Sequence, residues 1–441
     1  MKAALLFATA LAGIAAITAP ATAQDIAITN ARLVVGDGTA PIDGGTVVVR
    51  NGRVAAAGAG VAVPAGVTVV DAGGKWVTPG LVAGFSRVGL IEVDAVDGTN
   101  DAEANDTIYS AAIDIAPALN PLGAPVAVNR LQGVTRALVY PGTGSSLFSG
   151  RGALVDLGAD TDMVTRAGVF QYVEFGERGA GRTGGSRAIT FLQFRSLLAE
   201  ARDYGRNPGA HGNLSKDALL TRADAEALLR VLDGRDRLFI KADRAADILA
   251  IISLMRDYPG IKPTLIGAAE GWTVARQIAA ANIPVIASAL NDLPDSFERL
   301  AATQSNIGRM RAAGVQVSIG LVDDNETHKL GYARQYAGNL VALTRLPGAT
   351  GLNWDQAFAT IASGPAVAAG IDGQVGSLRV GRVGDVVIWD GDPLEVTSVP
   401  VAVYIDGVVQ PMTSRQTELR DRYLDPVARD LPNAYEHGVR R

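Results

Sequence analysis

The chain of 441 residues contains no cysteine, so it can form neither a disulfide framework nor a thiolate metal site. It has only three histidines, His211, His328 and His437, and no two of them stand at the spacing of paired metal ligands. The formal net charge is -5, without a basic tract, and this argues against nucleic acid as a partner. After the first 23 residues no apolar run approaches the roughly 18 residues that a membrane-spanning helix needs.

The first 23 residues have the features of a secretory signal peptide. Lys2 supplies a short positive region, residues 3–19 are mostly apolar, and Ala21-Thr22-Ala23 is a typical cleavage site before Gln24. A membrane anchor is the alternative, but the short apolar run and the small residues after it favour cleavage. We therefore predict a soluble mature protein that is periplasmic or secreted.

Short strands are expected at both ends of the chain, and alternating strands and helices between them. Asn51-Gly52 between two apolar runs is the strongest short signal for a β-hairpin, and residues 386–390 and 401–407 give further strands near the C-terminus. Between these ends, strands such as residues 238–240 are followed by segments with helical spacing, such as residues 245–255. Repeated units of this kind predict a parallel sheet with helices outside it.

One stretch carries a family resemblance. An apolar strand follows Thr78-Pro79-Gly80-Leu81 and ends at Phe85-Ser86-Arg87. This frame resembles the metal-dependent amidohydrolase superfamily, whose segment is roughly Thr-Pro-Gly-Leu-Ile-Asp-x-His-x-His, with both histidines on a metal. The run from Gly376 to Val387 is similar to the closing strands of the same family. The chain most resembles the imidazolonepropionase-like, exported bacterial subgroup, with Phe85 and Arg87 in place of the two histidines.

The resemblance implies an α/β fold, a (β/α)8 TIM-like barrel inserted in a small β-sandwich built from both chain ends. Function in such barrels lies at the carboxyl ends of the strands. The domains expected after the signal peptide (1–23) are the N-terminal part of the sandwich (24–78), the barrel (79–370), the C-terminal part of the sandwich (371–412) and a charged tail (413–441).

The family uses zinc or another divalent metal to activate water for attack on a carbonyl carbon. Its ligands are histidines on the first, fifth and sixth strands, a lysine or glutamate on the fourth and an aspartate on the eighth. At these positions the chain has Phe85 and Arg87, Lys241 and Asp243, Gly267, and Asp323, while the fourth-strand residue stays unassigned. Relatives of the imidazolonepropionase-like type often have glycine on the sixth strand, so that departure weighs less. We predict that the chain lacks the two-metal centre, and we assign no cofactor.

Charged residues nevertheless remain at the predicted barrel mouth. Asp323 is the candidate catalytic residue, and the candidate ligand-binding residues are Arg87, Lys241, Asp243, Arg244, Glu270 and Asp324. In one interpretation Arg87 and Lys241 hold a carboxylate and Asp243 or Asp323 an ammonium group. In the other, these residues are internal salt bridges that fill the space of the metal. The arginine-containing segment 176–187 is either a lid over the mouth or a surface loop.

Three functional hypotheses stay open at this point. The first is a hydrolase of non-peptide or dipeptide C–N bonds with a single metal near Asp323, Asp243 and Glu270. The second is a metal-free homologue that has lost catalysis and binds a small polar ligand. The third is a structural partner of an active paralogue, and assembly into a homo-oligomer is compatible with each of the three.

Overall fold

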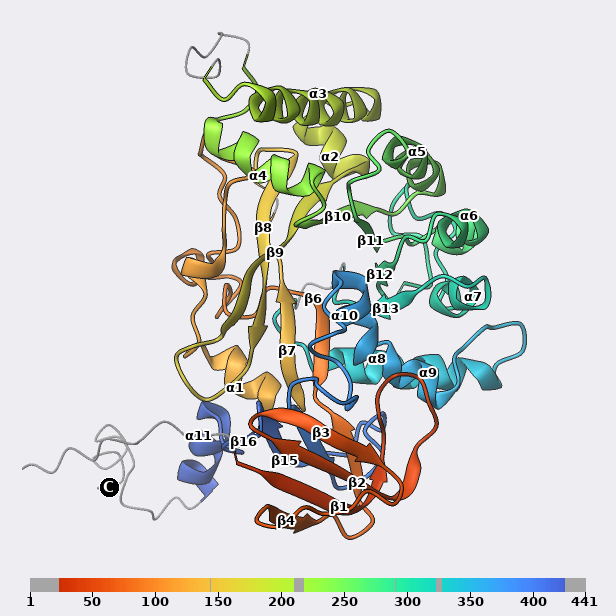
Figure 1. The fold of residues 1–441 in the computed structure, drawn as a ribbon. Helices are drawn as coiled ribbons and strands as arrows, with labels where there is room; N and C mark the ends of the chain where they lie inside the picture. The colour runs from red at the N-terminus through yellow and green to blue at the C-terminus, as the bar shows by residue number, and fades with distance from the viewer. Residues whose placement is uncertain (1–23, 143, 210–217, 290, 323–326, 425–441) are drawn as a thin grey trace, which may run out of the picture.

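The computed structural model describes residues 24–142, 144–209, 218–289, 291–322 and 327–424, in which two β-sheets organise the chain (Figure 1). The predicted signal peptide lies outside the described residues. In Figure 1 the sheet that contains β1 to β4 is at the bottom, and the barrel is above it. The two sheets are described in turn because the second one positions the candidate site.

The first sheet joins strands from both ends of the chain. Its order is β16-β15-β14-β5-β1-β2-β3, with β4 paired to β1. The two ends meet where β5 pairs antiparallel with β14, for example Thr78 with Val387. This confirms the sheet expected from both chain ends. The strands are β1 (Ile26–Leu33), β2 (Ile42–Arg50), β3 (Arg53–Gly58), β4 (Thr68–Asp71), β5 (Trp76–Pro79), β14 (Val386–Trp389), β15 (Pro400–Ile405) and β16 (Val408–Val409).

The hairpin predicted at Asn51-Gly52 is confirmed between β2 and β3. Both residues have positive φ angles, 50° and 72°. A two-residue turn of this kind matches the twist of the flanking strands, and asparagine and glycine adopt this left-handed backbone at the lowest cost.

The second sheet is a nearly closed barrel with the order β13-β12-β11-β10-β9-β8-β7-β6. The amide of Leu321, just beyond β13, donates to the carbonyl of Phe85 on β6 at 3.3 Å and brings the two edges together. This confirms the TIM-like barrel. The strands are β6 (Leu81–Ser86), β7 (Val134–Val139), β8 (Phe148–Asp156), β9 (Val164–Glu174), β10 (Arg237–Ala242), β11 (Pro263–Gly267), β12 (Val285–Ala287) and β13 (Val317–Ile319).

The expectation of an entirely parallel barrel sheet was wrong at one strand. β8 runs antiparallel to both of its neighbours, β7 and β9. The connections on either side of β8, residues 140–147 and 157–163, explain this. Parallel neighbours need a crossover of about a dozen residues or more, whereas antiparallel neighbours can be joined by a short turn.

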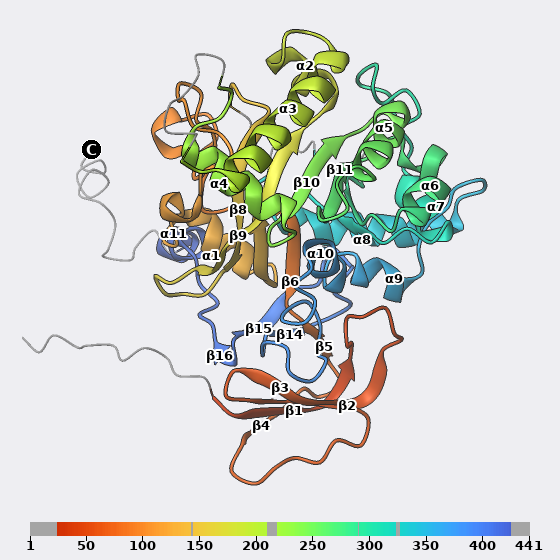
Figure 2. The ribbon, with the colours of Figure 1, turned by 45° about the horizontal axis from the view of Figure 1, so that its top comes forward.

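Helices surround the barrel, as Figure 2 shows for α3 to α7. The segment 176–187, expected as a lid or a surface loop, contains α2, a turn at residues 183–186 and the first residue of α3. None of the described helices is long and apolar enough to cross a membrane. The helices are α1 (Ala124–Arg130), α2 (Gly176–Arg182), α3 (Arg187–Arg206), α4 (Arg222–Leu232), α5 (Ala245–Met255), α6 (Ala275–Ala280), α7 (Asn306–Ala312), α8 (Tyr332–Ala342), α9 (Trp354–Ala359), α10 (Ser363–Ala369) and α11 (Arg415–Leu424).

Aromatic rings fill the inside of the barrel. Phe170 on β9 stacks on Phe239 on β10 with ring centroids 3.9 Å apart. Because successive side chains of a strand alternate between its faces, the residues two positions further on face the same way. Those residues are Tyr172 and Lys241, and Lys241 lies at the carboxyl end of β10. The packed aromatic interior thus carries polar side chains at one end of the barrel.

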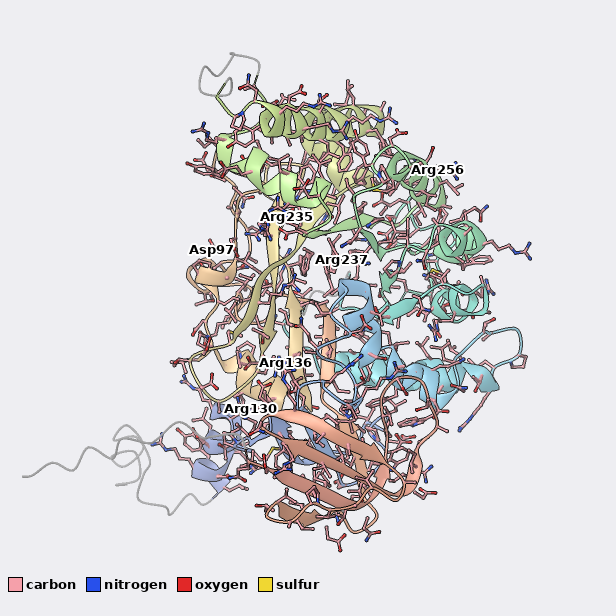
Figure 3. The ribbon with its side chains drawn as sticks, viewed as in Figure 1. Asp97, Arg130, Arg136, Arg235, Arg237 and Arg256 are labelled. Carbon is pink, nitrogen blue, oxygen red and sulfur yellow. The ribbon has the colours of Figure 1, made fainter. Side chains whose placement is uncertain are left out.

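A buried arginine joins the barrel to the first sheet. Arg136 on β7 is 1% exposed, and Figure 3 shows it between the barrel strands and that sheet. Its Nε and Nη2 donate to both carboxylate oxygens of Asp385 at 2.8 and 3.1 Å. Asp406 lies 2.6 Å from Nη2 and Asp156 lies 3.5 Å from Nη1. Burial raises the pKa of Asp156 to about 6 although Arg136 opposes the shift.

Candidate ligand-binding site at the barrel mouth

A cavity of about 460 Å³ opens at the end of the barrel where most strands have their carboxyl ends. Residues at or just beyond the ends of β6, β7, β9 and β10 line it, together with Asp295, Ser296, Glu298 and Arg299 from the connection between β12 and α7. Functional residues of (β/α)8 barrels lie at this end. We call this cavity the mouth cavity.

The base of the mouth cavity is aromatic. Phe85 and Tyr140 are stacked with ring centroids 3.5 Å apart, and Tyr172 meets both rings edge-on at 5.5 Å. The first of the two expected histidine positions is therefore occupied by a ring that packs on its neighbours. Phe85 offers no atom to a metal.

Arg87, at the second histidine position, lies over the ring of Tyr140 with its guanidinium carbon 5.0 Å from the ring centre. Its Nη2 is 3.3 Å from a carboxylate oxygen of Glu103. Burial alone would lower the pKa of Arg87, but Tyr140 and Glu103 outweigh it, so the pKa is raised. Arg87 thus brings a permanent positive charge to the mouth.

The two fifth-strand positions form an ion-paired cluster. Lys241 Nζ contacts Oδ2 of Asp243, and the same oxygen accepts from Nη2 and Nε of Arg299 at 2.9 and 3.1 Å. Burial would raise the pKa of Asp243, but Lys241 and Arg299 outweigh it and hold the pKa below its ordinary value. We call these three residues the mouth ion cluster.

Arg299 was missed by sequence reasoning. It lies in the connection between β12 and α7, and no sequence motif includes it. This connection places its side chain beside the carboxyl end of β10. A second contact fixes it, because its Nη1 is 3.0 Å from Asp295. Glu298 of the same segment lines the cavity and accepts from Arg187 at 3.1 Å. Burial raises the pKa of Glu298 although the Glu177 amide opposes the shift.

The fourth strand of the barrel, β9, ends at Glu174. Glu174 lines the mouth cavity, and its backbone is in register with Lys241 on β10. Arg182 Nη1 lies 3.1 Å from Glu174 Oε2, and Arg178 lies at 3.8 Å from the other oxygen. In the sequence, only the end of the long strand 164–174 indicates that Glu174 lies at the barrel mouth. Segment 176–187 thus contributes α2 and two arginine partners for Glu174.

Three predicted site residues, Arg87, Lys241 and Asp243, line the mouth cavity, whereas Arg244 and Glu270 do not. Arg244 pairs with both carboxylate oxygens of Asp247 at 3.1 and 2.6 Å. Glu270 accepts from the backbone amides of residues 245 and 301 at 2.9 and 3.1 Å. It therefore links the start of α5 to the connection between β12 and α7. Asp323 and Asp324 lie outside the described residues.

A divalent metal prefers imidazole and carboxylate donors. Among the ligand positions that the structure describes, Phe85 has no donor atom, and Arg87 and Lys241 are cations. The carboxylates of Asp243 and Glu174 are already paired with cations. A side chain at Gly267 would begin with a Cβ only 2.4 Å from Oδ1 of Asp243. In the part of the chain that the structure describes, no three histidine, aspartate or glutamate side chains are grouped to hold an ion. No step through a metal can be derived from these residues.

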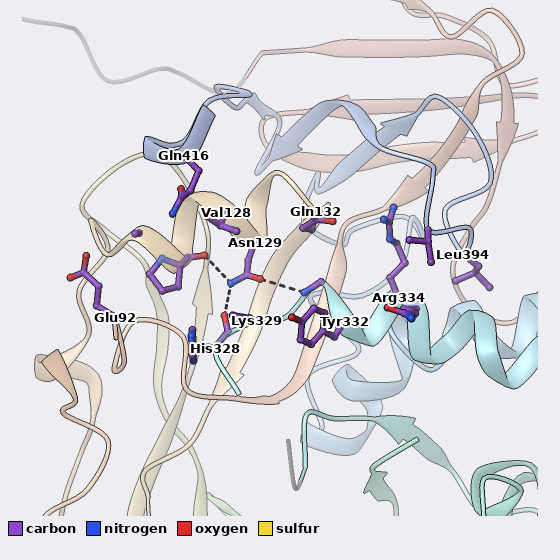
Figure 4. A pocket seen from close by; sticks show the side chains of 15 residues that line it. Glu92, Val128, Asn129, Gln132, His328, Lys329, Tyr332, Arg334, Leu394 and Gln416 are labelled. Carbon is purple, nitrogen blue, oxygen red and sulfur yellow. Dashed lines mark hydrogen bonds between the residues drawn. The ribbon is translucent and has the colours of Figure 1, made fainter. Parts of the chain in front are cut away.

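A second cavity, of about 570 Å³, lies beside α1, α8 and α11 (Figure 4). His328 is among its lining residues and does not line the mouth cavity. Asn129 at its centre donates to the carbonyls of Pro125 and His328 at 2.8 and 2.6 Å and accepts from the amide of Leu330 at 2.7 Å. These hydrogen bonds hold α1 against the segment before α8, so Asn129 has a structural role.

Comparison with known proteins gives four findings. The model of the Amidohydrolase family matches residues 155–414. Amidohydrolase tasK of Hapsidospora irregularis is 24% identical over 406 residues, which cover 84% of this chain and 39% of that protein, so the chain spans less than half of this relative. Imidazolonepropionase of Maricaulis maris is 25% identical over 407 residues, covering 84% of this chain and 94% of that protein. A crystal structure of an amidohydrolase from Thermotoga maritima shares the fold, with a TM-score of 0.75, 23% identity, and coverage of 87% of this chain and 99% of its own.

Proposed function

The chain belongs to the amidohydrolase family, and from that premise we propose that it is an exported member with impaired hydrolysis that binds a small polar ligand without a metal. The mouth ion cluster carries this proposal. Lys241 and Arg299 share the carboxylate of Asp243 on the strand where the family has histidine ligands. The positive charge that a metal would supply there comes instead from the protein.

Electrostatic repulsion explains why the mouth ion cluster and a bound divalent metal exclude one another. At an effective dielectric constant near 20, two like unit charges about 4 Å apart repel by roughly 4 kcal/mol. A divalent ion next to Lys241 and Arg299 would meet about twice this repulsion from each of them, and only Lys241 could relieve it by losing a proton. Arg87 adds a third cation on the same cavity. Family-type hydrolysis, in which the metal activates water, is therefore disfavoured by this chain's own side chains.

The mouth cavity supports the ligand-binding part of the proposal. Its volume suits a small molecule. The aromatic base would contact apolar parts of the ligand, while the carboxylate of Glu298 and the guanidinium of Arg87 supply charges of both signs at its wall. Export is supported by the first 23 residues, which have the composition of a signal peptide.

Restoring the first-strand histidines tests the proposal. We expect the double variant Phe85→His, Arg87→His to bind zinc about tenfold more tightly than the unmodified chain, because it gains two imidazoles and loses one fixed cation. Zinc titration by calorimetry measures the difference. We expect no gain in hydrolysis, because Lys241 and Arg299 still pair with Asp243.

The double variant Phe85→Asn, Arg87→Gln is the matched control, since it removes the same ring and cation without adding imidazole. It should bind zinc no better than the unmodified chain. Zinc affinity in the unmodified chain equal to that of the histidine variant would contradict the proposal.

A further inference from the structure

The chain contains six lysines, and of those that the structure describes only Lys241 lines the mouth cavity. Its side chain is 10% exposed, while Lys75, Lys262 and Lys329 are exposed. We propose that Lys241 is a nucleophile that forms an imine with a small aldehyde or ketone bound in the mouth cavity. This activity goes beyond the ligand binding proposed above.

The position of Lys241 suits a nucleophile. It stands at the carboxyl end of β10, where barrel enzymes place reacting groups. A Cβ on Gly267 would lie 2.7 Å from Lys241 Nζ, so the bare backbone of Gly267 leaves the room that the amine occupies. The rigid strand and the contact with Asp243 fix the amine at the wall of the cavity.

The charges around Lys241 act in opposite directions, because Asp243 favours the ammonium form and Arg299 favours the neutral amine. Oδ2 of Asp243 is divided between Lys241 and the two nitrogens of Arg299, so Lys241 does not hold this carboxylate alone. A neighbouring cation that cannot lose its proton makes the neutral amine more accessible, which is a known way of activating lysine. The product keeps the same pairing, because a protonated imine carries the same single positive charge as the ammonium group it replaces.

The reaction needs no oxidant or reductant. The Lys241 ammonium group loses a proton to water, and the nitrogen lone pair then adds to the carbonyl carbon. The former carbonyl oxygen becomes a hydroxyl, takes up a proton and leaves as water while the C=N bond forms. The balance is one ammonium and one carbonyl giving one protonated imine and one water.

Other groups of the same cavity could orient the carbonyl compound. Nε of Arg87 and Oγ of Ser296 are buried, line the cavity, and have no hydrogen-bond partner among the described residues. Both can donate to an oxygen of the ligand, and the rings of Phe85 and Tyr172 would pack on its carbon atoms. The cavity therefore offers polar contacts and apolar area beside a single amine.

Reductive trapping tests the proposal on the full mature chain. The protein is incubated with propanal or with glyoxylate in the presence of cyanoborohydride, and modified lysines are located by peptide mapping. We expect Lys241 to be modified about tenfold faster than Lys75 or Lys262, although those two are exposed. The faster probe shows whether the carbonyl ligand is neutral or carries a carboxylate.

The comparison among lysines of one unmodified protein does not depend on any variant. Modification of Lys241 that is no faster than that of Lys75 and Lys262, with both probes, would overturn the proposal. The variant Lys241→Arg keeps the cation beside Asp243 and should lose only the Lys241 adduct. Metal content is measured on the same sample, so failure of imine formation can be told apart from failure of the metal-free proposal.

Discussion

Replacing Arg136 with methionine is expected to lower the free energy of unfolding by about 3–5 kcal/mol, because it leaves three carboxylates without their buried partner. Arg136 is 1% exposed and pairs with Asp385, Asp406 and Asp156. These contacts join the barrel to the sheet built from the chain ends. Denaturant unfolding of the two proteins measures the difference.

Arg50→Met is the matched control for this change, because Arg50 pairs with Asp25 at 3.1 Å but is half exposed. Exposed pairs contribute about 0–1 kcal/mol, so the control should be close to the unmodified protein. Equal effects of the two changes would contradict the role assigned to Arg136.

The same cluster has a pH dependence whose sign follows from Asp156. Its pKa is raised from 3.8 to about 6 in the folded protein, so the folded state binds more protons than the unfolded state between these pH values. The contribution of Asp156 to stability is therefore fully present below about pH 4 and is lost as the pH rises through 6, a change of roughly 2–3 kcal/mol. Asp156→Asn should remove this contribution, while Asp406, whose pKa is also raised by burial, keeps its own.

Asp243→Asn is expected to lower the free energy of unfolding by about 3 kcal/mol, because it leaves Lys241 and Arg299 buried together without their shared carboxylate. Denaturant unfolding of the two proteins measures the difference.

Asp295→Asn is the matched control, because Asp295 also pairs with Arg299, at 3.0 Å, but its side chain is 60% exposed. The control should cost about 1 kcal/mol or less. If Asp243→Asn lowers the free energy of unfolding no more than Asp295→Asn does, the mouth ion cluster does not stabilise the fold as expected.

The site residues that could be predicted are those at the carboxyl ends of strands. Phe85, Arg87, Lys241 and Asp243 stand at or just beyond the ends of apolar runs with a recognisable frame, so their place at the mouth could be inferred. The alternation of strand side chains then orients them. The barrel and the sheet from both chain ends were predictable for the same reason.

The parts that were missed depend on contacts between distant segments. Arg299 comes from a connection that no motif marks, and its partner Asp243 lies 56 residues away in the chain. Glu270 was expected in the site, but its carboxylate fastens the backbone of two connections. The reversed direction of β8 is set by the short connections on both sides, which an apolar strand pattern does not report.

Metal content together with chelator response tests the central claim most directly. The unmodified protein, purified without a chelator, is analysed for zinc and other divalent ions and is then unfolded thermally with and without a chelator. We expect far less than one ion per chain and the same unfolding midpoint in both conditions, since removing an ion that binds the folded state would lower the midpoint by mass action. One tightly held zinc per chain, with a lower midpoint after chelation, would contradict the metal-free mouth.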